Sequence, residues 1–469
     1  MLPALAILGG CSVINQFDDV KAGPAGAGGA PTAGSGGSSP DGGSTGGNGG
    51  SATGGSATAG SGGTSDAGPD ATVRLLNCRF VIGSATGGHR KLDDFSQIPN
   101  ASERVLADKF FMMPTGNGTS VRILTQLRGQ QNTYSEYFAS DTMTGFQPQP
   151  IVSNGRLLDA HKLNVSTSGA LIIETTSPTM VEGPRFLLHT FDDANVGAQP
   201  TIAAITNPGA LGTSGSIEGI FSPDPMGTFT VAASFSATGT VFQAAVGIVR
   251  QPSQPIQLIP LFQDADSNVV RPSSVVRVAG GSSYAFYGET FRGQREYEIK
   301  SDGTVGPMRA LTGTASVLLA NMSLSGKLDV MMGDVNTTAL TLKLLVGQFD
   351  LSQAMTFDVT QLVTAKEASS ISEVPVGALS GFVGDILLFG GPTGLSRKEL
   401  SILFIDAMGR VRAEQKLADT PGEVANGVVF PRGTNTGVTG NYHIAWSETL
   451  LDPAGQKYDT VWYDQLECL

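Results

Sequence analysis

The sequence predicts an all-β fold for most of its 469 residues, and three observations lead to that prediction. Residues 73–469 lack long helical periodicity, and short apolar runs recur there between clusters of Gly, Asn, Asp and Ser, which is typical of strands joined by turns. The chain holds 62 Gly, nearly twice the usual share of about 7%, and tight turns between many short strands need such residues. One strand-like pattern also recurs seven times along this region.

The chain begins with MLPALAILGGCS, an apolar run that ends in two Gly residues before Cys11. This string resembles the lipobox of bacterial lipoproteins, in which the signal peptide is cleaved before the Cys and lipid is attached to its thiol. The resemblance implies a signal peptide at residues 1–10 and an acylated Cys11, and several acyl chains anchor a protein stably. Ser12 follows the Cys where an Asp would favour the inner membrane, so the resemblance implies the outer membrane. Residues 1–10 contain no Lys or Arg, unlike the usual signal peptide, and a chance Gly-Gly-Cys is the alternative.

Residues 11–72 are predicted to form a disordered tether that begins at the acylated Cys. From Ala22 to Thr72 the chain is mostly Gly, Ala, Ser, Thr and Pro with a few Asp, so it has almost no large apolar side chain to bury. A flexible coil of about 50 residues has a root-mean-square reach of roughly 40 Å, which holds a domain clear of a lipid surface. Gly- and Ser-rich stretches after a lipobox resemble the tethers of lipoproteins from high-GC Gram-negative bacteria.

One element recurs through residues 73–469: small polar residues, a Gly, and then a run of large apolar residues that predicts a strand. The seven occurrences are residues 115–126, 166–176, 224–234, 279–289, 323–333, 381–391 and 436–446. Their apolar centres are separated by roughly 45–60 residues. A further apolar strand follows, often with a turn and a fourth strand, as at residues 295–311, 340–359 and 399–417. The turns at residues 301–303 and 407–409 each contain a Gly, which suits hairpin tips that need positive φ.

Each repeat unit is therefore expected to be a four-stranded antiparallel sheet. A single sheet of this kind cannot bury both of its faces, whereas seven sheets arranged radially can, and they leave only short edges. The sequence thus predicts a seven-bladed β-propeller over residues 73–469. The fourth and fifth repeats are more closely spaced than the others, so six or eight blades are alternatives, and two stacked β-sandwiches are a further one.

Cys78 and Cys468 lie in the first and last apolar strands of this predicted domain. The last unit supplies three strands, GVVFPRG, NYHIAWSE and DTVWYDQLEC, and the N-terminal strand CRFVIG would complete it. Antiparallel neighbours would bring the two cysteines within the Cα separation of roughly 4.4–6.8 Å that a disulfide needs. An exported protein can form such a bond. The sequence therefore predicts a disulfide between Cys78 and Cys468, with two buried thiols as the alternative.

The charge balance argues against a nucleic-acid partner. The 41 acidic residues outnumber the 29 basic ones, and no run of Lys and Arg is present to neutralise phosphates. No stretch reaches the roughly 18 apolar residues of a membrane-spanning helix. The 4 His residues lack the spacing of metal ligands, and no nucleophile motif is present. The sequence predicts no metal, no cofactor and no catalytic residue, and the domain is expected to be a monomer.

The segments that follow the seven repeated strands carry a candidate binding feature. In a propeller these segments connect the second and third strands of each blade and open on the usual ligand-binding face. Five of them contain a cation: Arg128, Arg185, Arg292, Arg397 next to Lys398, and Lys457. A ring of cations would receive an acidic or carboxylate-bearing ligand, and ordinary solvated charge is the alternative.

These features predict a lipid-anchored protein of the bacterial cell envelope, facing the periplasm or the cell surface. Its propeller is expected to bind a protein or an acidic glycan without catalysis. Propellers host enzymes as well, so the alternative is a glycan-active hydrolase or lyase with a site at the pore mouth. Converging carboxylates, or a Tyr, Glu and Arg set, at the pore mouth would favour the enzyme. A scaffold for envelope assembly is a third hypothesis.

Overall fold

A computed structural model of the chain describes most strands of residues 77–469 and some of their connections. The described residues are 77–82, 89–94, 106–115, 120–128, 133–139, 149–152, 155–164, 166–174, 183–195, 198–212, 217–223, 228–236, 242–251, 253–264, 270–277, 281–289, 293–312, 316–322, 328–336, 341–349, 356–358, 363–368, 375–381, 384–393, 396–406, 411–432, 440–451, 453, 455 and 457–469. The predicted signal peptide at residues 1–10 and the predicted tether at residues 11–72, Cys11 included, lie outside them. Among the described residues, no helix is both long enough and apolar enough to cross a membrane.

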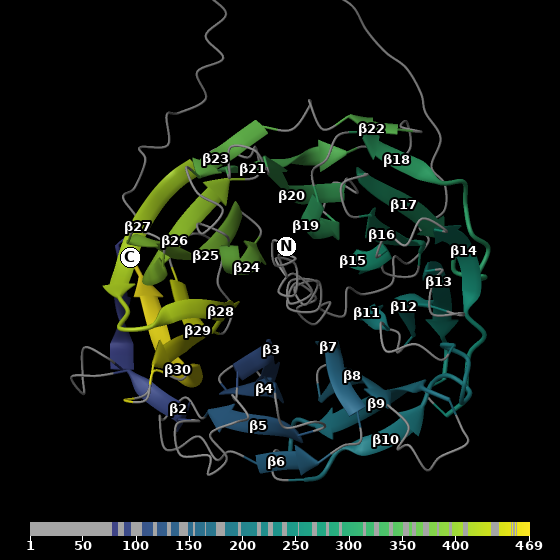
Figure 1. Cartoon of the computed structure of the whole chain (residues 1–469), viewed down its shortest axis with the longest axis horizontal. Helices are drawn as coiled ribbons and strands as arrows, with labels where there is room; N and C mark the ends of the chain where they lie inside the picture. The colour runs from purple at the N-terminus through teal and green to yellow at the C-terminus, as the bar shows by residue number, and fades with distance from the viewer. Residues whose placement is uncertain are drawn as a thin grey trace, which may run out of the picture. The chain divides into compact units, whose positions relative to one another are not determined.

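The described strands form an all-β fold of sheets that are antiparallel except for one added strand and that follow one another along the chain (Figure 1). Sheet 1 contains β3 (Leu106–Thr115), β4 (Ser120–Arg128), β5 (Thr133–Ala139) and β6 (Gln149–Val152). Sheet 2 contains β7 (Gly155–Asn164), β8 (Thr167–Glu174), β9 (Arg185–Asp192) and β10 (Thr201–Ala204). Sheet 3 contains β11 (Glu218–Pro223), β12 (Phe229–Ser236), β13 (Phe242–Val249) and β14 (Ile259–Asp264).

The remaining sheets continue this pattern, and two of them have added strands. Sheet 4 contains β15 (Val270–Arg277), β16 (Ser283–Glu289), β17 (Gly293–Ile299), β18 (Arg309–Thr312) and the added β22 (Thr356–Asp358). Sheet 5 contains β19 (Ser316–Met322), β20 (Leu328–Asn336), β21 (Thr341–Phe349) and β23 (Val363–Ala368). Sheet 6 contains β24 (Pro375–Gly381), β25 (Gly384–Thr393), β26 (Ser396–Asp406) and β27 (Val411–Asp419). Sheet 7 contains β28 (Glu423–Pro431), β29 (Gly440–Leu451), β30 (Lys457–Cys468) and the N-terminal strands β1 (Cys78–Phe80) and β2 (Arg90–Asp94).

The repeated strands predicted from the sequence occupy one structural position. Each becomes the second strand of its sheet, and these strands are β4, β8, β12, β16, β20, β25 and β29. In each sheet the second strand pairs antiparallel with the first and with the third, as in β11, β12 and β13. The prediction of repeated four-stranded antiparallel units is therefore confirmed.

The first strands of most successive sheets contact one another. Contacts join β3 to β7, β7 to β11, β11 to β15, β15 to β19, β24 to β28, and β28 back to β3. Figure 1 shows these first strands innermost, with the later strands of each sheet further out. The last sheet of the chain therefore neighbours the first.

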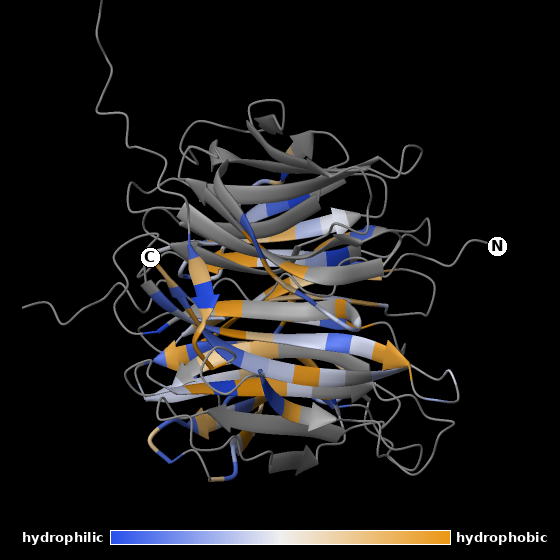
Figure 2. Ribbon diagram, turned by 90° about the vertical axis from the view of Figure 1, so that its left-hand side faces the viewer, coloured by the Kyte–Doolittle hydropathy of each residue, from blue (hydrophilic) through white to orange (hydrophobic). Residues whose placement is uncertain are grey.

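The hydrophobic core lies between neighbouring sheets rather than in one central layer. One cluster packs side chains of sheet 2, such as Leu158, against those of sheet 3, such as Phe221. A second cluster packs Val246 of sheet 3 against Tyr287 of sheet 4. All 8 residues of β12 are buried, since sheet 3 has a neighbour on each face. Figure 2 shows hydrophobic residues spaced along the strands of the stacked sheets, as this arrangement requires.

The segment at residues 340–359 was expected to supply two strands of one sheet, and this expectation is wrong. Its first part is β21 of sheet 5, but β22 pairs in parallel with β18 of sheet 4. The fourth strand of sheet 5 is instead β23. A short edge strand such as β18 has unpaired backbone groups on its outer side, and β22 covers them.

The predicted turn at residues 301–303 is a hairpin tip. Gly303 has φ of +94°, which a residue without Cβ adopts at little cost. The Lys300 N–H bonds to the Thr304 carbonyl at 2.9 Å, and the Thr304 N–H bonds to Asp302 Oδ1 at 2.8 Å. The prediction of positive φ is confirmed here, and the similar turn at residues 407–409 lies outside the described residues.

Strand β1 borders β30, so the N-terminal strand completes sheet 7. The pairing places Cys78 directly opposite Cys468. Strand β2 pairs with β30 further along, with Arg90 opposite Tyr463. The sequence indicated one closing strand, whereas the structure has two short ones, which follow one another along the same edge of β30.

Candidate functional site

The five predicted cations all lie where the second strand of a sheet connects to the third. Arg128 is the last residue of β4, and Arg292 directly precedes β17. Arg185 and Lys457 begin β9 and β30, and Arg397 is the second residue of β26. The side chains of Arg128, Arg397 and Lys457, and the whole of Arg292, fall outside the described part of the chain.

Arg185 has a described side chain and a carboxylate partner. It lies opposite Glu174 in the pairing of β8 with β9, and its Nε donates to Glu174 Oε2. The two side chains are 31% and 23% exposed. Because the carboxylate compensates its charge locally, Arg185 contributes less to an anion-binding ring than an unpaired cation would.

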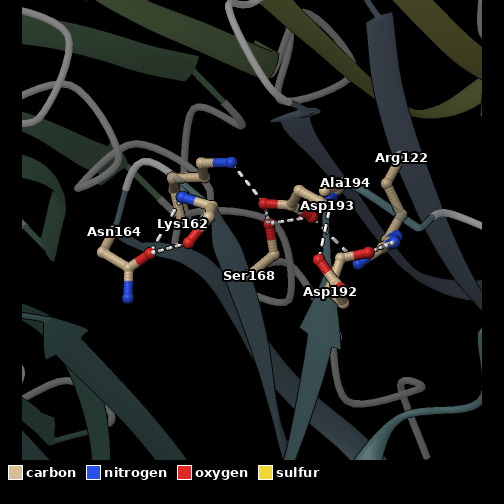
Figure 3. A network of polar contacts seen from close by, with 8 residues as sticks. Arg122, Lys162, Asn164, Ser168, Asp192, Asp193 and Ala194 are labelled. Carbon is tan, nitrogen blue, oxygen red and sulfur yellow. Dashed lines mark hydrogen bonds and ion pairs between the residues drawn. The ribbon is translucent and has the colours of Figure 1, made fainter.

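A polar network centred on Asp193 joins sheet 1 to sheet 2 (Figure 3). Arg122 of β4 places Nη1 at 3.1 Å from Asp193 Oδ1, and Lys162 of β7 forms an ion pair with Asp193 Oδ2. Ser168 of β8 donates its hydroxyl to the same carboxylate, at 3.1 Å from Oδ1 and 2.9 Å from Oδ2. Arg122 also donates Nη2 to the Asp192 carbonyl at 3.3 Å.

This Asp193 network ties two sheets together. The side chains of Arg122 and Asp193 are fully buried, and that of Lys162 is 6% exposed. A buried charge is costly unless it is paired and hydrogen-bonded, so the pairing holds the two sheets at one relative position. The Phe191 ring lies 4.6 Å from the Arg122 guanidinium and covers it.

A second buried carboxylate, Asp159 on β7, joins sheet 2 to sheet 3. Its Oδ2 accepts the Phe221 N–H of β11 at 2.8 Å and lies 2.9 Å from His161 Nε2. Its Oδ1 accepts the Ala160 N–H at 2.9 Å. Both Asp159 and His161 have zero exposure, and the Phe221 ring packs edge-on against the imidazole at 4.7 Å. His161 Nδ1 is buried and has no hydrogen-bond partner among the described residues.

A Tyr, Glu and Arg set converges on sheet 4. Arg309 Nε lies 3.1 Å from Glu296 Oε2, and Arg309 Nη2 lies 3.6 Å from Glu298 Oε2. The Tyr284 ring centre lies 5.9 Å from the guanidinium carbon. Burial raises the pKa of Glu296 to about 7, although the nearby Arg309 opposes this shift and Glu298 adds to it. The Glu296 carboxyl therefore holds its proton at mildly acidic pH.

The N-terminal strands bring a partly exposed imidazole to sheet 7. His89 directly precedes β2, and its Nδ1 lies 2.8 Å from Oδ2 of Asp464 on β30. Asp464 Oδ1 accepts the Ile82 N–H at 2.8 Å and the Gln465 N–H at 2.7 Å. The Asp464 side chain is fully buried, whereas that of His89 is 29% exposed.

The closure of sheet 7 brings Cys78 and Cys468 together, and they form a disulfide. Gln415 of β27, in sheet 6, holds the same strand through its side-chain amide. Its Oε1 accepts the Cys78 N–H and its Nε2 donates to the Cys78 carbonyl, both at 2.6 Å. At the exposed edge Arg79 Nη2 lies 2.6 Å from Glu467 Oε2. The N-terminal strand is thus fastened to two sheets.

Arg122, Glu296 and Asp464 were not predicted from the sequence as residues of any site. Arg122 interrupts the apolar run of β4 (SVRILTQLR), and a charge in such a position is a signal that sequence reasoning can use. Glu296 and Asp464 lie in strands with several other polar residues, which give no such signal. Which neighbour pairs with each charge depends on contacts between sheets, which a single sequence does not reveal. In the part of the chain that the structure describes, no group of three or more His, Cys, Asp and Glu side chains is arranged to hold a metal ion.

Comparisons with known proteins give distant likenesses. No family model matches the sequence, and no curated protein matches it. A subtype N11 neuraminidase-like protein from a flat-faced bat isolate is 8% identical, with a TM-score of 0.35, over 81% of this chain and 92% of that one. A protein of unknown function from Dyadobacter fermentans is 9% identical, with a TM-score of 0.41, over 81% of this chain and 100% of that one.

A third solved structure comes from a study of two prolyl endopeptidases. It is 12% identical, with a TM-score of 0.39, over 71% of this chain and 45% of that one. This chain therefore matches less than half of the endopeptidase. Likenesses at this level carry no argument about what this chain does.

Proposed function

We propose that this chain is a lipid-anchored protein of the bacterial outer membrane whose seven-bladed β-propeller binds a protein or an acidic glycan without catalysis. The closure of sheet 7 by β1 is the observation that carries the proposed architecture. It fastens the start of the domain to its last strand, with Cys78 opposite Cys468, as a radial arrangement requires and a pair of stacked sandwiches does not. The propeller is proposed to act as a monomer.

The placement of the five cations supports a binding role. In a propeller every first strand runs in the same direction, so the connections from second to third strands all emerge on one face. Arg128, Arg185, Arg292, Arg397 and Lys457 all lie at such connections. Positive charge gathered on one face attracts an acidic ligand and speeds its association.

Titration calorimetry with polygalacturonate, an acidic glycan, tests this role, with neutral dextran as the reference. Replacing Arg128 and Arg292 together with Ala should weaken binding by about tenfold or more, which corresponds to about 1.4 kcal/mol. Arg185→Ala is the matched control, since Glu174 already compensates that charge, and it should change the affinity by less than about twofold. Unchanged affinity in the double variant would reject the cation ring.

The buried polar clusters also favour binding over catalysis. The Asp193 network and Asp159 each join neighbouring sheets, so their charges serve to hold the domain together. The connections on the cation-bearing face are thereby left for recognition, since connecting segments carry most binding residues in such scaffolds.

The anchor rests on Cys11 and is tested separately. Radiolabelled palmitate should be incorporated into the full chain expressed in a Gram-negative host, and the chain should fractionate with the outer membrane. Cys11→Ala should abolish both the label and the membrane association. Membrane retention of the unlabelled variant would contradict the anchor without affecting the binding role.

A glycan-active hydrolase or lyase is the second candidate, and the Tyr284, Glu296, Glu298 and Arg309 set favours it by its composition. Its placement argues against it. Glu296 and Arg309 lie on the third and fourth strands of sheet 4, away from the innermost strand, and Glu296 has no exposure to solvent. The glycosidic bond of a substrate cannot reach a carboxyl group that is fully buried. Reducing-sugar release from polygalacturonate would revive the enzyme hypothesis.

A further inference from the structure

The imidazole of His89 is held in one orientation by the Asp464 carboxylate. Both carboxylate oxygens are engaged, Oδ2 by His89 Nδ1 and Oδ1 by the N–H groups of Ile82 and Gln465. A carboxylate accepts hydrogen bonds, so the proton of a neutral His89 resides on Nδ1 and the lone pair on Nε2. The contact therefore fixes both the tautomer and the direction of Nε2.

The imidazole of His89 is partly exposed. The side chain is 29% exposed, and none of the described residues bonds to its Nε2. The pair of His161 and Asp159 differs, because His161 contacts the carboxylate through Nε2 and has zero exposure. The His89 side chain is therefore partly accessible to solvent, whereas that of His161 is not.

The surroundings of His89 are aromatic on several sides. Ring centroids of Phe80, Trp446 and Trp462 lie 4.5, 5.0 and 6.5 Å from the imidazole, and all three meet it at steep angles of 67–80°. Glu448, which accepts the Trp446 indole N–H at 2.8 Å, acts electrostatically on His89. The three rings give the imidazole apolar walls on several sides.

We propose that His89, positioned by Asp464, is a general base that activates water against a carboxylic ester with an apolar acyl or aryl group. The water O–H bond breaks, its proton passes to Nε2, and the oxygen bonds to the ester carbonyl carbon. The resulting tetrahedral adduct expels the alcohol oxygen, which takes the proton back from Nε2. Acid and alcohol leave, and the base is regenerated without an oxidant, reductant or metal. This activity goes beyond the proposed function, in which the cation-bearing connections bind their ligand without catalysis. It uses none of the five cations, so either proposal can fail without the other.

The test uses p-nitrophenyl acetate as the probe and the full, disulfide-bonded chain. The wild-type chain should release p-nitrophenolate faster than buffer, and His89→Gln should lower kcat by about 100-fold with little change in KM. The wild-type rate should rise with pH through a single ionisation as His89 loses its proton, and this dependence should vanish in the variant. Asp464→Asn should also slow the reaction, because an amide no longer fixes the tautomer.

Arg79→Gln is the matched control, since it removes a charge from the same N-terminal segment at an exposed ion pair. It should leave the rate and its pH dependence unchanged. Carbethoxylation with diethyl pyrocarbonate keeps the test decisive if a variant fails to fold: modification of His89, located by mass spectrometry, should abolish hydrolysis by the wild-type chain in proportion. The proposal is overturned if the wild type is no faster than buffer, or if modified or substituted His89 supports the full rate.

Discussion

Two His–Asp pairs in this domain have the same chemistry and different surroundings. In both, a buried Asp carboxylate contacts one ring nitrogen of a His. The same carboxylate accepts the backbone N–H of the residue that directly follows the Asp. Asp159 also binds the N–H of Phe221 on the next sheet, and its partner His161 is fully enclosed. Asp464 instead binds an N–H of the N-terminal segment, and its partner His89 is 29% exposed.

The difference follows from where each pair lies in its sheet. Strand β7 is the first strand of sheet 2, and β3 and β11 contact it from the sheets on either side. Strand β30 is the third strand of sheet 7, and its outer neighbours are the short strands β1 and β2. The same two residue types therefore form an internal tie at one place and a solvent-accessible base at the other.

Removing the disulfide should lower the stability of the domain more than any other predicted change. The disulfide fastens β1, which borders the same strand, β30, that carries the partner of His89. Replacing Cys78 and Cys468 together with Ser is expected to lower the free energy of unfolding by about 5 kcal/mol, because the cross-link closes a very long loop in the unfolded chain. The sequence separation is 390 residues. Urea unfolding measures the change, and Cys11→Ser is the control that should leave it unaffected. Two free thiols at these positions in the unreduced mature protein would contradict the bond.

Removing the carboxylates compares the two pairs directly. Asp159→Ala is expected to lower the free energy of unfolding by about 4 kcal/mol, because it leaves the buried N–H of Phe221 and an enclosed imidazole without a hydrogen-bond partner. Asp464→Ala should cost about 2 kcal/mol, since water can reach His89 and the disulfide still holds β1. Urea unfolding of both variants gives the order. A larger loss for Asp464→Ala would show that exposure does not distinguish the pairs.

Two buried groups elsewhere in the domain should set how its stability depends on pH. Burial lowers the pKa of His189 to about 4, partly opposed by Glu174, whereas burial raises that of Glu296 to about 7. The stability that the neutral His189 contributes to the folded state is present above its ordinary pKa of 6.5 and is lost as pH falls to 4. The contribution of Glu296 is present below its ordinary pKa of 4.5 and is lost as pH rises to 7. These opposite trends largely cancel in the wild type.

Glu296→Gln should unmask the His189 trend. Stability of this variant is expected to rise by about 3 kcal/mol between pH 4 and pH 6.5, since each unit of pKa shift corresponds to about 1.4 kcal/mol. Urea unfolding across this pH range provides the measurement, with Glu298→Gln as the control at a partly exposed neighbour. A variant whose stability is as flat with pH as that of the wild type would refute the assignment of Glu296.

The predicted elements divide according to how local their causes are. The seven repeated strands were predicted from Gly and apolar runs, and all became second strands, because those signals act within a dozen residues. Residues 340–359 failed as a prediction because β22 joins the edge of another sheet. Nothing local distinguishes a strand that pairs with its own sheet from one that covers a neighbour's edge.

The site residues divide in the same way. The five cations were proposed from their position after the repeated strands, and the structure places Arg128, Arg185, Arg397 and Lys457 at the ends of second or third strands where these two strands connect. Whether each cation is compensated was not predictable, as the pairing of Arg185 with Glu174 illustrates. His89 and Asp464 lie 375 residues apart in the sequence, so no spacing rule connects them.

The sequence by itself determined that the domain is built from repeated antiparallel β units, and it indicated that Cys78 would meet Cys468. Alternating apolar runs and turn residues carry that information, because burial of one strand face and reversal of the chain are local requirements. The tertiary structure decided which buried charges meet, and which of two His–Asp pairs stays accessible. Those outcomes depend on how neighbouring sheets cover each strand, since burial and pairing of a charge are properties of the surface packed against it.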